Sequence, residues 1–314
     1  MRVHILCDRR SGTRWLSAAT HSTCVLPDGA MLAYEVLGAT HLGNALPLVL
    51  VCGMASTRAD WVRLSSTWAQ IRPVLVYDHK GIGDSTSPPD IGVDEFAMET
   101  LARDLAFLIG HLDWEDAVAI LGFSMGGVVV QQMLVLPYLP TEPTPLPFRP
   151  THVILACTRA EILRDPKYGL QTVPEPSATP KKPQTNAERY ENVRRTIEAT
   201  VDPTWLKKNE NIWFVCWQKK SGECAHIIYS SNLGLRSLTK LQLFDFAAFL
   251  QRLPPDLPVL IINDQIIPFE CSKVYLFGSS LSLLSFFFLL RKSFAVSPPR
   301  GSLKLAPSRA SYSP

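Results

Sequence analysis

Residues 121–127 read LGFSMGG, and this stretch decides the fold of the chain. The apolar run DAVAILG (116–122) leads into it, and GGVVVQQMLVL (126–136) follows with the length and composition of a helix. Glycines on both sides of Ser124 suit a strained strand-to-helix turn, where neighbouring side chains would clash. The pattern predicts that Ser124 is a nucleophile at the start of a helix, whose backbone N–H groups can stabilise a developing oxyanion.

Five short apolar runs predict strands that are buried on both faces. They are rich in Val, Ile and Leu, which is typical of a parallel sheet covered by helices. The runs are PLVLVC (47–52), RPVLVY (72–77), DAVAILG (116–122), HVILAC (152–157) and LPVLII (257–262). Before them, residues 23–26 and 31–37 flank Pro27-Asp28-Gly29 and predict a β-hairpin.

Helical patterns lie between the predicted strands. From Glu95 to Leu112, leucines at 101, 105, 108 and 112 recur at helical spacing, and Asp94 is available as the N-cap. Strands that alternate with helices after an opening hairpin predict an α/β domain with a doubly wound, mostly parallel sheet.

Composition favours an ordinary globular domain. Of the 314 residues, 46% are apolar and 19% are charged, which is enough for a substantial core. The net charge of +3 is uneven, because residues 271–314 hold six basic and no acidic residues, whereas residues 1–270 hold 25 basic and 28 acidic ones. No basic cluster lies on the predicted domain, so a nucleic-acid partner is not expected. The seven cysteines show no C-x-x-C spacing, which favours a reducing compartment and no zinc site.

Changes in composition divide the chain into five parts. Residues 1–22 form a leader expected to be disordered, and residues 23–158 the first part of the core. Residues 159–255, rich in Pro and Trp, are expected to form a helical cap inserted between two core strands. The last core strand and a following loop occupy residues 256–272, and residues 273–314 form a divergent tail.

The leader lacks the apolar run of a secretory signal, and its arginines only faintly resemble a mitochondrial transit peptide. A cytoplasmic location is therefore expected, with mitochondrial and membrane-anchored ones as alternatives.

At these motifs the chain resembles the α/β-hydrolase superfamily, in particular capped members of fungal type. VLVCGM (49–54) resembles the H-G-x turn after the third strand, with Cys52 in place of His. DHKGIGDS (78–85) resembles the D-x-R-G-x-G-x-S loop after the fourth strand, with Lys for Arg. The resemblance covers about residues 25–270, and it implies a cap between strands 6 and 7. It also implies an oxyanion hole made by the backbone amides of Met54 and Met125.

The resemblance further implies a catalytic order of Ser, then an acid, then His. DQIIP (264–268) makes Asp264 the expected acid, in a loop shorter than the family pattern. The histidine should follow an eighth strand, but all seven histidines precede Asp264: they are residues 4, 21, 41, 79, 111, 152 and 226. His79 and His226 are the candidate substitute bases, and an ordinary structural or solvated role is the alternative for both.

The tail changes character abruptly after Lys273, and three interpretations of it stay open. Val274–Leu290 has flanking basic residues and is a candidate membrane anchor at the short end of a span. It could instead replace lost core elements, or the reading frame could leave the ancestral coding sequence near Lys273. The last strand and helix of the fold are therefore expected to be missing or replaced.

These features predict a serine hydrolase acting on a small apolar ester, lactone or related carbonyl compound. A catalytically impaired or mis-spliced pseudo-hydrolase and a tail-anchored membrane hydrolase are the alternatives. Epoxide-hydrolase chemistry is not expected, because the resemblance implies an Asp at the position of Ser124 in such enzymes. No metal or nucleotide motif is present in the sequence, so no cofactor is expected.

Overall fold

The structure is a computed structural model that describes part of the 314-residue chain. The described residues are 4–7, 14–17, 21–54, 56–88, 97–160, 185, 188, 191, 203–208, 246, 249 and 252–262.

The strands and helices follow one another in the order expected from the apolar runs. The strands are β1 (His4–Cys7), β2 (Arg14–Ser17), β3 (Ser22–Val25), β4 (Met31–Leu37), β5 (Leu48–Val51), β6 (Val74–Tyr77), β7 (Ala117–Phe123), β8 (Arg149–Ala156) and β9 (Val259–Ile262). The helices are α1 (Val62–Trp68), α2 (Met98–His111), α3 (Met125–Val135) and α5 (Pro203–Lys208), with short 3-10 turns η1 (Ala39–His41), η2 (Arg58–Trp61) and η4 (Leu136–Tyr138).

Seven strands form one sheet in the order β3-β4-β6-β5-β7-β8-β9. The hairpin strands β3 and β4 are antiparallel, and β4 also runs antiparallel to β6. All other neighbours in this sheet pair in parallel. The predicted doubly wound, mostly parallel sheet with an opening hairpin is confirmed.

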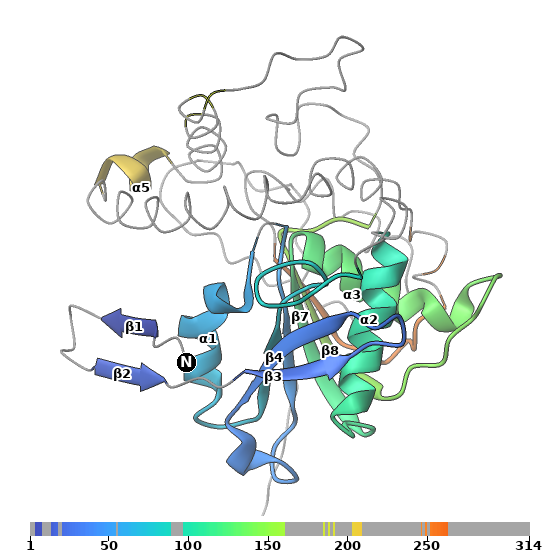
Figure 1. Cartoon of the computed structure of the whole chain (residues 1–314). Coiled ribbons are helices and arrows are strands. Elements are labelled where there is room, and N and C mark those ends of the chain that lie inside the picture. Colours follow the sequence, from blue (N-terminus) through green and yellow to red (C-terminus); the bar gives the residue numbers. More distant parts are fainter. Residues whose placement is uncertain are drawn as a thin grey trace, which may run out of the picture.

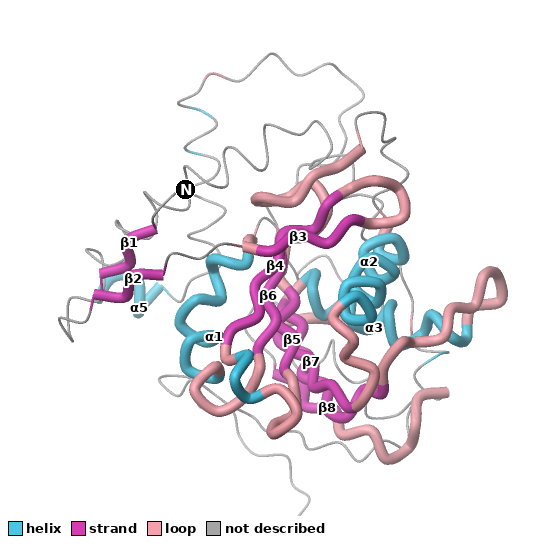
Figure 2. The backbone as a smooth tube through the Cα atoms, turned by 60° about the horizontal axis from the view of Figure 1, so that its bottom comes forward, coloured by secondary structure: helices cyan, strands magenta, loops and turns pink. Residues whose placement is uncertain are grey.

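Helices cover both faces of this sheet. In Figures 1 and 2, α2 and α3 lie against one face and α1 against the other. Residues of β5 alternate between the two sides, as the pleat of a strand requires. Val49 and Val51 belong to the larger apolar core with α2 and α3, whereas Leu48 and Leu50 belong to a smaller one against which Leu64 of α1 packs. Burial on both faces explains why the strands appear in the sequence as continuous apolar runs.

Within residues 1–22, β1 pairs with β2 in an antiparallel register. Ile5 lies opposite Leu16, and Leu6 lies opposite Trp15.

The helix expected from Glu95 begins later, at Met98. Its N-cap is Ala97, in an extended conformation and without a side-chain hydrogen bond to the helix. Asp94, the expected N-cap, lies outside the described residues. The leucine spacing predicts the buried face of α2, because apolar residues recur along that face over the whole helix. It carries no information on where the first turn begins.

The predicted insertion leaves the core after β8 and returns close to where it left. The Phe246 N–H donates to the Ala160 carbonyl at 2.9 Å, so the two ends of the segment between them lie together. Most of residues 159–255, and with them the predicted cap, lie outside the described residues, as do Asp264 and the whole tail with Val274–Leu290. No helix within the described ranges is long and apolar enough to cross a bilayer.

Candidate active site

Ser124 lies between β7 and α3 in a conformation that serine rarely adopts. Its φ is 53° and its ψ is −120°, and it is the residue immediately before the first turn of α3. Such a backbone conformation costs a non-glycine residue about 1–3 kcal/mol, and it persists only where the surroundings enforce it. Two hydrogen bonds hold the turn: the Ser124 N–H donates to the Ala156 carbonyl at 2.8 Å, and the Gly127 N–H donates to the Ser124 carbonyl at 3.0 Å.

The glycines around Ser124 are required by close backbone contacts. A Cβ on Gly122 would lie 2.6 Å from the Gly127 Cα, and a Cβ on Gly126 would lie 2.3 Å from the Val51 carbonyl oxygen. A Cβ on Gly127 would lie 2.5 Å from the side chain of Thr158. The turn therefore seats α3 directly on the ends of β5 and β8. This is the strained strand-to-helix turn that LGFSMGG predicts.

The chain segment after β5 lies directly beside this turn. Val51 pairs with Gly122 in the parallel register, so Cys52, Gly53 and Met54 continue alongside residues 123–125. A Cβ on Gly53 would lie 3.3 Å from the Ser124 Cβ. Cys52–Met54 therefore lies beside Ser124, and it is called the oxyanion turn after the role proposed for it below.

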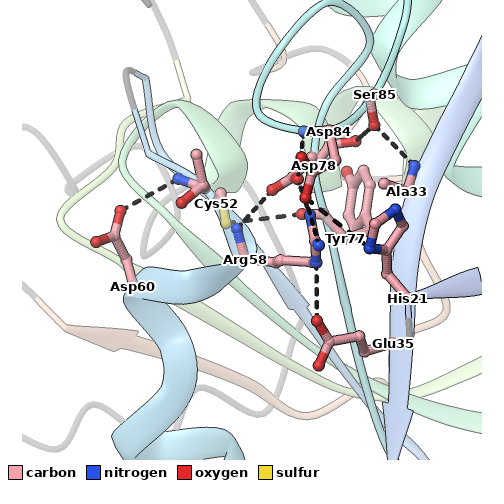
Figure 3. Close-up of polar contacts among 11 residues, drawn as sticks. His21, Ala33, Glu35, Cys52, Arg58, Asp60, Tyr77, Asp78, Asp84 and Ser85 are labelled. Carbon is pink, nitrogen blue, oxygen red and sulfur yellow. Dashed lines mark hydrogen bonds and ion pairs between the residues drawn. The ribbon is translucent and has the colours of Figure 1, made fainter. Parts of the chain in front are cut away.

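Arg58, just beyond the oxyanion turn, is surrounded by three carboxylates (Figure 3). Its Nε donates to Glu35 Oε1 at 3.0 Å, one terminal nitrogen donates to Asp84 Oδ2 at 2.7 Å, and the other pairs with Asp78 Oδ2. Its backbone N–H also donates to Asp78 Oδ1 at 2.7 Å. Sequence reasoning missed Arg58, because no local pattern relates it to carboxylates 20 or more positions away.

Asp78 is fully buried and organises the loop after β6. Besides Arg58, the Asp84 N–H donates to its carboxylate at 3.0 Å, and a Cβ on Gly83 would lie 2.3 Å from Asp78 Oδ2. Burial raises the pKa of the Asp78 carboxyl, and Arg58 opposes this by stabilising the charged form. Ser85 ties the same loop to β4: its hydroxyl donates to the Asp78 carbonyl and accepts from the Ala33 N–H. These contacts account for the D-x-K-G-x-G-x-S pattern.

Lys80 of this loop is buried between two further carboxylates. Its Nζ lies 2.5 Å from Asp28 Oδ2 in the hairpin turn and 3.1 Å from Asp104 Oδ2 in α2. Burial raises the pKa of Asp104 to about 6, although Lys80 favours its charged form. For Asp28 burial acts in the same direction, but the hydrogen bonds from Lys80 and from the Ala30 N–H prevail and lower its pKa.

The raised pKa of Asp104 predicts a pH-dependent stability. Between pH 4 and pH 6 the folded chain holds a proton on Asp104 that the unfolded chain has lost, so stability falls as pH rises through this window. Relative to Asp104→Asn, the wild type should lose about 2 kcal/mol of unfolding free energy between pH 4.5 and pH 7.5. Urea denaturation of both proteins measures this difference.

Asp28→Asn is the matched control, because its carboxylate contacts the same lysine with a lowered pKa. Relative to that variant, the wild type should lose stability as pH falls instead of as pH rises. A difference between wild type and Asp104→Asn that does not change with pH would show that Asp104 titrates normally.

His79 cannot act as the base for Ser124 in the described arrangement. It is almost completely enclosed, its Nε2 lies 3.0 Å from the Cys52 carbonyl oxygen, and its Nδ1 lies 3.2 Å from the Tyr77 hydroxyl. Both ring nitrogens are therefore engaged away from Ser124. His111 ends α2 as expected, whereas His152, expected to start a strand, is the fourth residue of β8. His226 lies outside the described residues.

The strand that precedes Asp264 ends at the same edge of the sheet as β7. Phe123 pairs with Ala156, and Ala156 pairs with Ile262, the last residue of β9. Two strand spacings separate Phe123 from Ile262, a distance of about 10 Å. Asp264 follows Ile262 by two residues, and its own position lies outside the described residues.

Apolar side chains flank Ser124. Phe123 and Met54 are 40% and 38% exposed. The Trp61 ring meets the Phe123 ring edge-on, with centroids 6.4 Å apart. Nowhere in the described part of the chain do three or more His, Cys, Asp or Glu side chains gather as a metal ion would require.

This geometry can be compared with that of known proteins. Residues 47–196 match the family model described as alpha/beta hydrolase fold. The structure superposes on an esterase from a Rhodococcus species with a TM-score of 0.60, at 21% sequence identity, over 84% of this chain and 90% of the esterase. The chain has the α/β-hydrolase fold.

Curated relatives of this α/β-hydrolase-fold chain include epoxide hydrolases. It is 28% identical over 146 residues to bifunctional epoxide hydrolase 2 of Sus scrofa, covering 42% of this chain and 25% of the relative. It is 32% identical over 87 residues to a soluble epoxide hydrolase of a Corynebacterium species, covering 28% of this chain and 29% of the relative. The chain thus spans less than a third of the length of the curated relatives that it matches.

Proposed function

We propose that this chain is a serine hydrolase that cleaves a small apolar ester, lactone or related carbonyl compound. The observation that carries the proposal is Ser124 in its strained conformation at the start of α3, with the oxyanion turn beside it. A strained residue at the N-terminus of a helix, enforced by glycine contacts on two sides, is the kind of feature that catalysis explains and stability does not.

In this reaction the Ser124 Oγ attacks the carbonyl carbon of the substrate and its proton passes to a base. The carbonyl oxygen becomes an oxyanion, which the backbone N–H groups of Met54 and Met125 stabilise. Collapse of the tetrahedral intermediate expels the alcohol, which takes up the proton, and leaves an acyl group on Ser124. Water then attacks this acyl-enzyme, releases the carboxylic acid and restores the serine. Asp264 is the proposed acid. Because His79 is engaged elsewhere, His226 is the remaining candidate for the base that takes up this proton.

The nature of the nucleophile argues for carbonyl substrates over epoxides. Attack of a carboxylate on an epoxide gives an ester, which water can hydrolyse, so the enzyme is regenerated. Attack of the Ser124 hydroxyl would give an ether, which water does not cleave under these conditions. The names of the curated relatives therefore do not carry over to this chain. The exposed side chains of Phe123 and Met54 favour a substrate with an apolar group next to the carbonyl.

The distribution of histidines favours a second candidate, a catalytically impaired hydrolase. The sequence has no histidine after His226, and His79 is engaged elsewhere. Without a base, Ser124 would be a weak nucleophile, and only substrate binding and the oxyanion hole would remain.

Hydrolysis of 4-nitrophenyl butyrate distinguishes these candidates. We expect the wild type to turn the ester over, and Ser124→Ala to lower kcat/KM at least about 100-fold. Ser66→Ala, which alters an exposed serine of α1, is the matched control and should leave the rate unchanged. Styrene oxide should not be turned over. Equal rates for wild type and Ser124→Ala would refute the serine mechanism, and absence of turnover in a folded wild type would favour the impaired hydrolase.

A further inference from the structure

Residue 52 of the oxyanion turn is held by side chains that surround it on several sides. The His79 Nε2 lies 3.0 Å from the Cys52 carbonyl oxygen. The Trp61 Nε1–H donates to Cys52 Sγ at 3.0 Å, and the thiol lies 3.9 Å from the Tyr77 carbonyl oxygen, to which it can donate. Figure 3 shows Cys52 in the same group of polar contacts as Tyr77 and the Arg58 cluster.

The backbone of α3 also lies close to the Cys52 carbonyl. A Cβ on Gly126 would lie 2.4 Å from the Cys52 carbonyl oxygen, so the backbone of α3 passes within contact distance of it. The Cys52 carbonyl is thus confined between His79 and the helix that begins after Ser124. The Gly53 N–H shares the peptide plane of this carbonyl, so it would turn with it, and the next peptide group, which carries the Met54 N–H, would be displaced as well.

The hydrogen bonds determine which nitrogen of His79 carries the proton. A carbonyl oxygen only accepts, so Nε2 must donate to Cys52 and therefore carries a hydrogen. Nδ1 is then free to accept the hydrogen of the Tyr77 hydroxyl at 3.2 Å. The arrangement is satisfied by a neutral imidazole in the Nε2–H tautomer. Burial lowers the pKa of His79, and the bond to Cys52 opposes this only in part, so the neutral form is the one that burial favours.

We propose that His79 is a positioning residue, which fixes the direction of the Cys52 carbonyl and thereby aims the Met54 amide at the oxyanion formed on Ser124. The hydrogen bond from His79 to the Cys52 carbonyl is called the tether below. Its catalytic consequence rests on the proposed function, but the tether itself does not depend on turnover. Tyr77 fixes the tautomer of His79, and Trp61 holds the Cys52 side chain, so the turn is held by both its backbone and its side chain.

The contact with His79 stands in a turn whose own sequence departs from the family pattern. Where the family pattern has a histidine at position 52, this chain has a cysteine, whose thiol is a weak hydrogen-bonding group. The imidazole comes instead from His79, 27 residues further along the chain, and it acts on the backbone of the same turn. A histidine that was a candidate base is therefore assigned to the oxyanion hole.

Nuclear magnetic resonance of the wild type gives the first test, because it requires neither a variant nor activity. Long-range 15N–1H spectra at pH 7 should show His79 as the neutral Nε2–H tautomer. An Nδ1–H tautomer or a charged ring at this pH would overturn the proposal.

Variants at position 79 give the second test. Glutamine can place a donor near the position of Nε2, whereas leucine of similar size cannot donate. In His79→Leu the amide resonances of Gly53 and Met54 should shift or broaden while those of β3 and α2 stay in place, and His79→Gln should restore them. The rate at which a fluorophosphonate modifies Ser124 should fall at least about 10-fold in His79→Leu and recover in His79→Gln.

The outcomes separate this inference from the proposed function. Unchanged Gly53 and Met54 resonances in a folded His79→Leu variant would overturn the tether. If instead those resonances move but the wild type never forms a fluorophosphonate adduct, the proposed function fails and the tether stands, because its spectroscopic signals need no reaction.

Discussion

Replacement of Arg58 by methionine is expected to lower the unfolding free energy by about 3–5 kcal/mol at neutral pH. Methionine preserves much of the side-chain volume, so the loss reports on charge. Asp78 is fully buried, and in the variant its carboxylate would lose its cationic partner within the core. A buried charge without a partner is among the largest single destabilising effects in proteins.

The pH dependence of this loss identifies its cause. Burial already raises the pKa of Asp78 while Arg58 is present, and the pKa should rise further without it. A folded-state pKa above the unfolded one makes stability fall as pH rises, so the deficit of Arg58→Met should be larger at pH 8 than at pH 5. The double variant with Asp78→Asn should recover part of the loss. Chemical denaturation measures the unfolding free energy at both pH values. A loss in Arg58→Met below about 1 kcal/mol, or an equal loss at pH 5 and pH 8, would contradict the role of Arg58 as the partner of the Asp78 charge.

Replacement of Gly126 by alanine is expected to destabilise the chain by about 3 kcal/mol. The added Cβ would lie 2.3 Å from the Val51 carbonyl oxygen and 2.4 Å from that of Cys52. Both neighbours are backbone atoms, so either α3 or the oxyanion turn must move. Helix propensity alone favours alanine over glycine by about 1 kcal/mol, and the clash should exceed this gain. Thermal and urea denaturation measure the change.

Gly110→Ala is the matched control, because Gly110 also lies in a helix, α2. There the new Cβ would meet only the Pro147 side chain, at 3.3 Å, and the change should stay within about 1 kcal/mol of zero. Equal effects of the two substitutions would mean that the contact between α3 and the end of β5 is looser than the structure shows.

Much of the fold follows from the sequence because its signals are local and repeat. The apolar runs of β5, β6, β7 and β9 and the glycines around Ser124 each depend on residues within a few positions of one another. The start of α2 at Met98 does not follow from the sequence, because helix caps have weak local signatures.

The residues of the candidate site also differ in whether local sequence patterns predict them. Ser124 and the turn at Met54 could be placed from motifs, since both lie next to buried strands of recognisable composition. The Arg58 cluster joins residues 20 to 26 positions apart, and no spacing rule relates them. The sequence places His79 in the loop after β6, but whether its ring faces Ser124 or the core depends on tertiary packing around Tyr77 and Cys52.

The most direct measurement of the central claim, that Ser124 is an activated nucleophile, is intact-mass analysis after treatment with a fluorophosphonate. We predict that the folded wild type gains the mass of one adduct, that peptide mapping places it on Ser124, and that Ser124→Ala gains none. A wild type that is folded and stays unmodified, or a Ser124→Ala variant that is labelled equally, would contradict the claim.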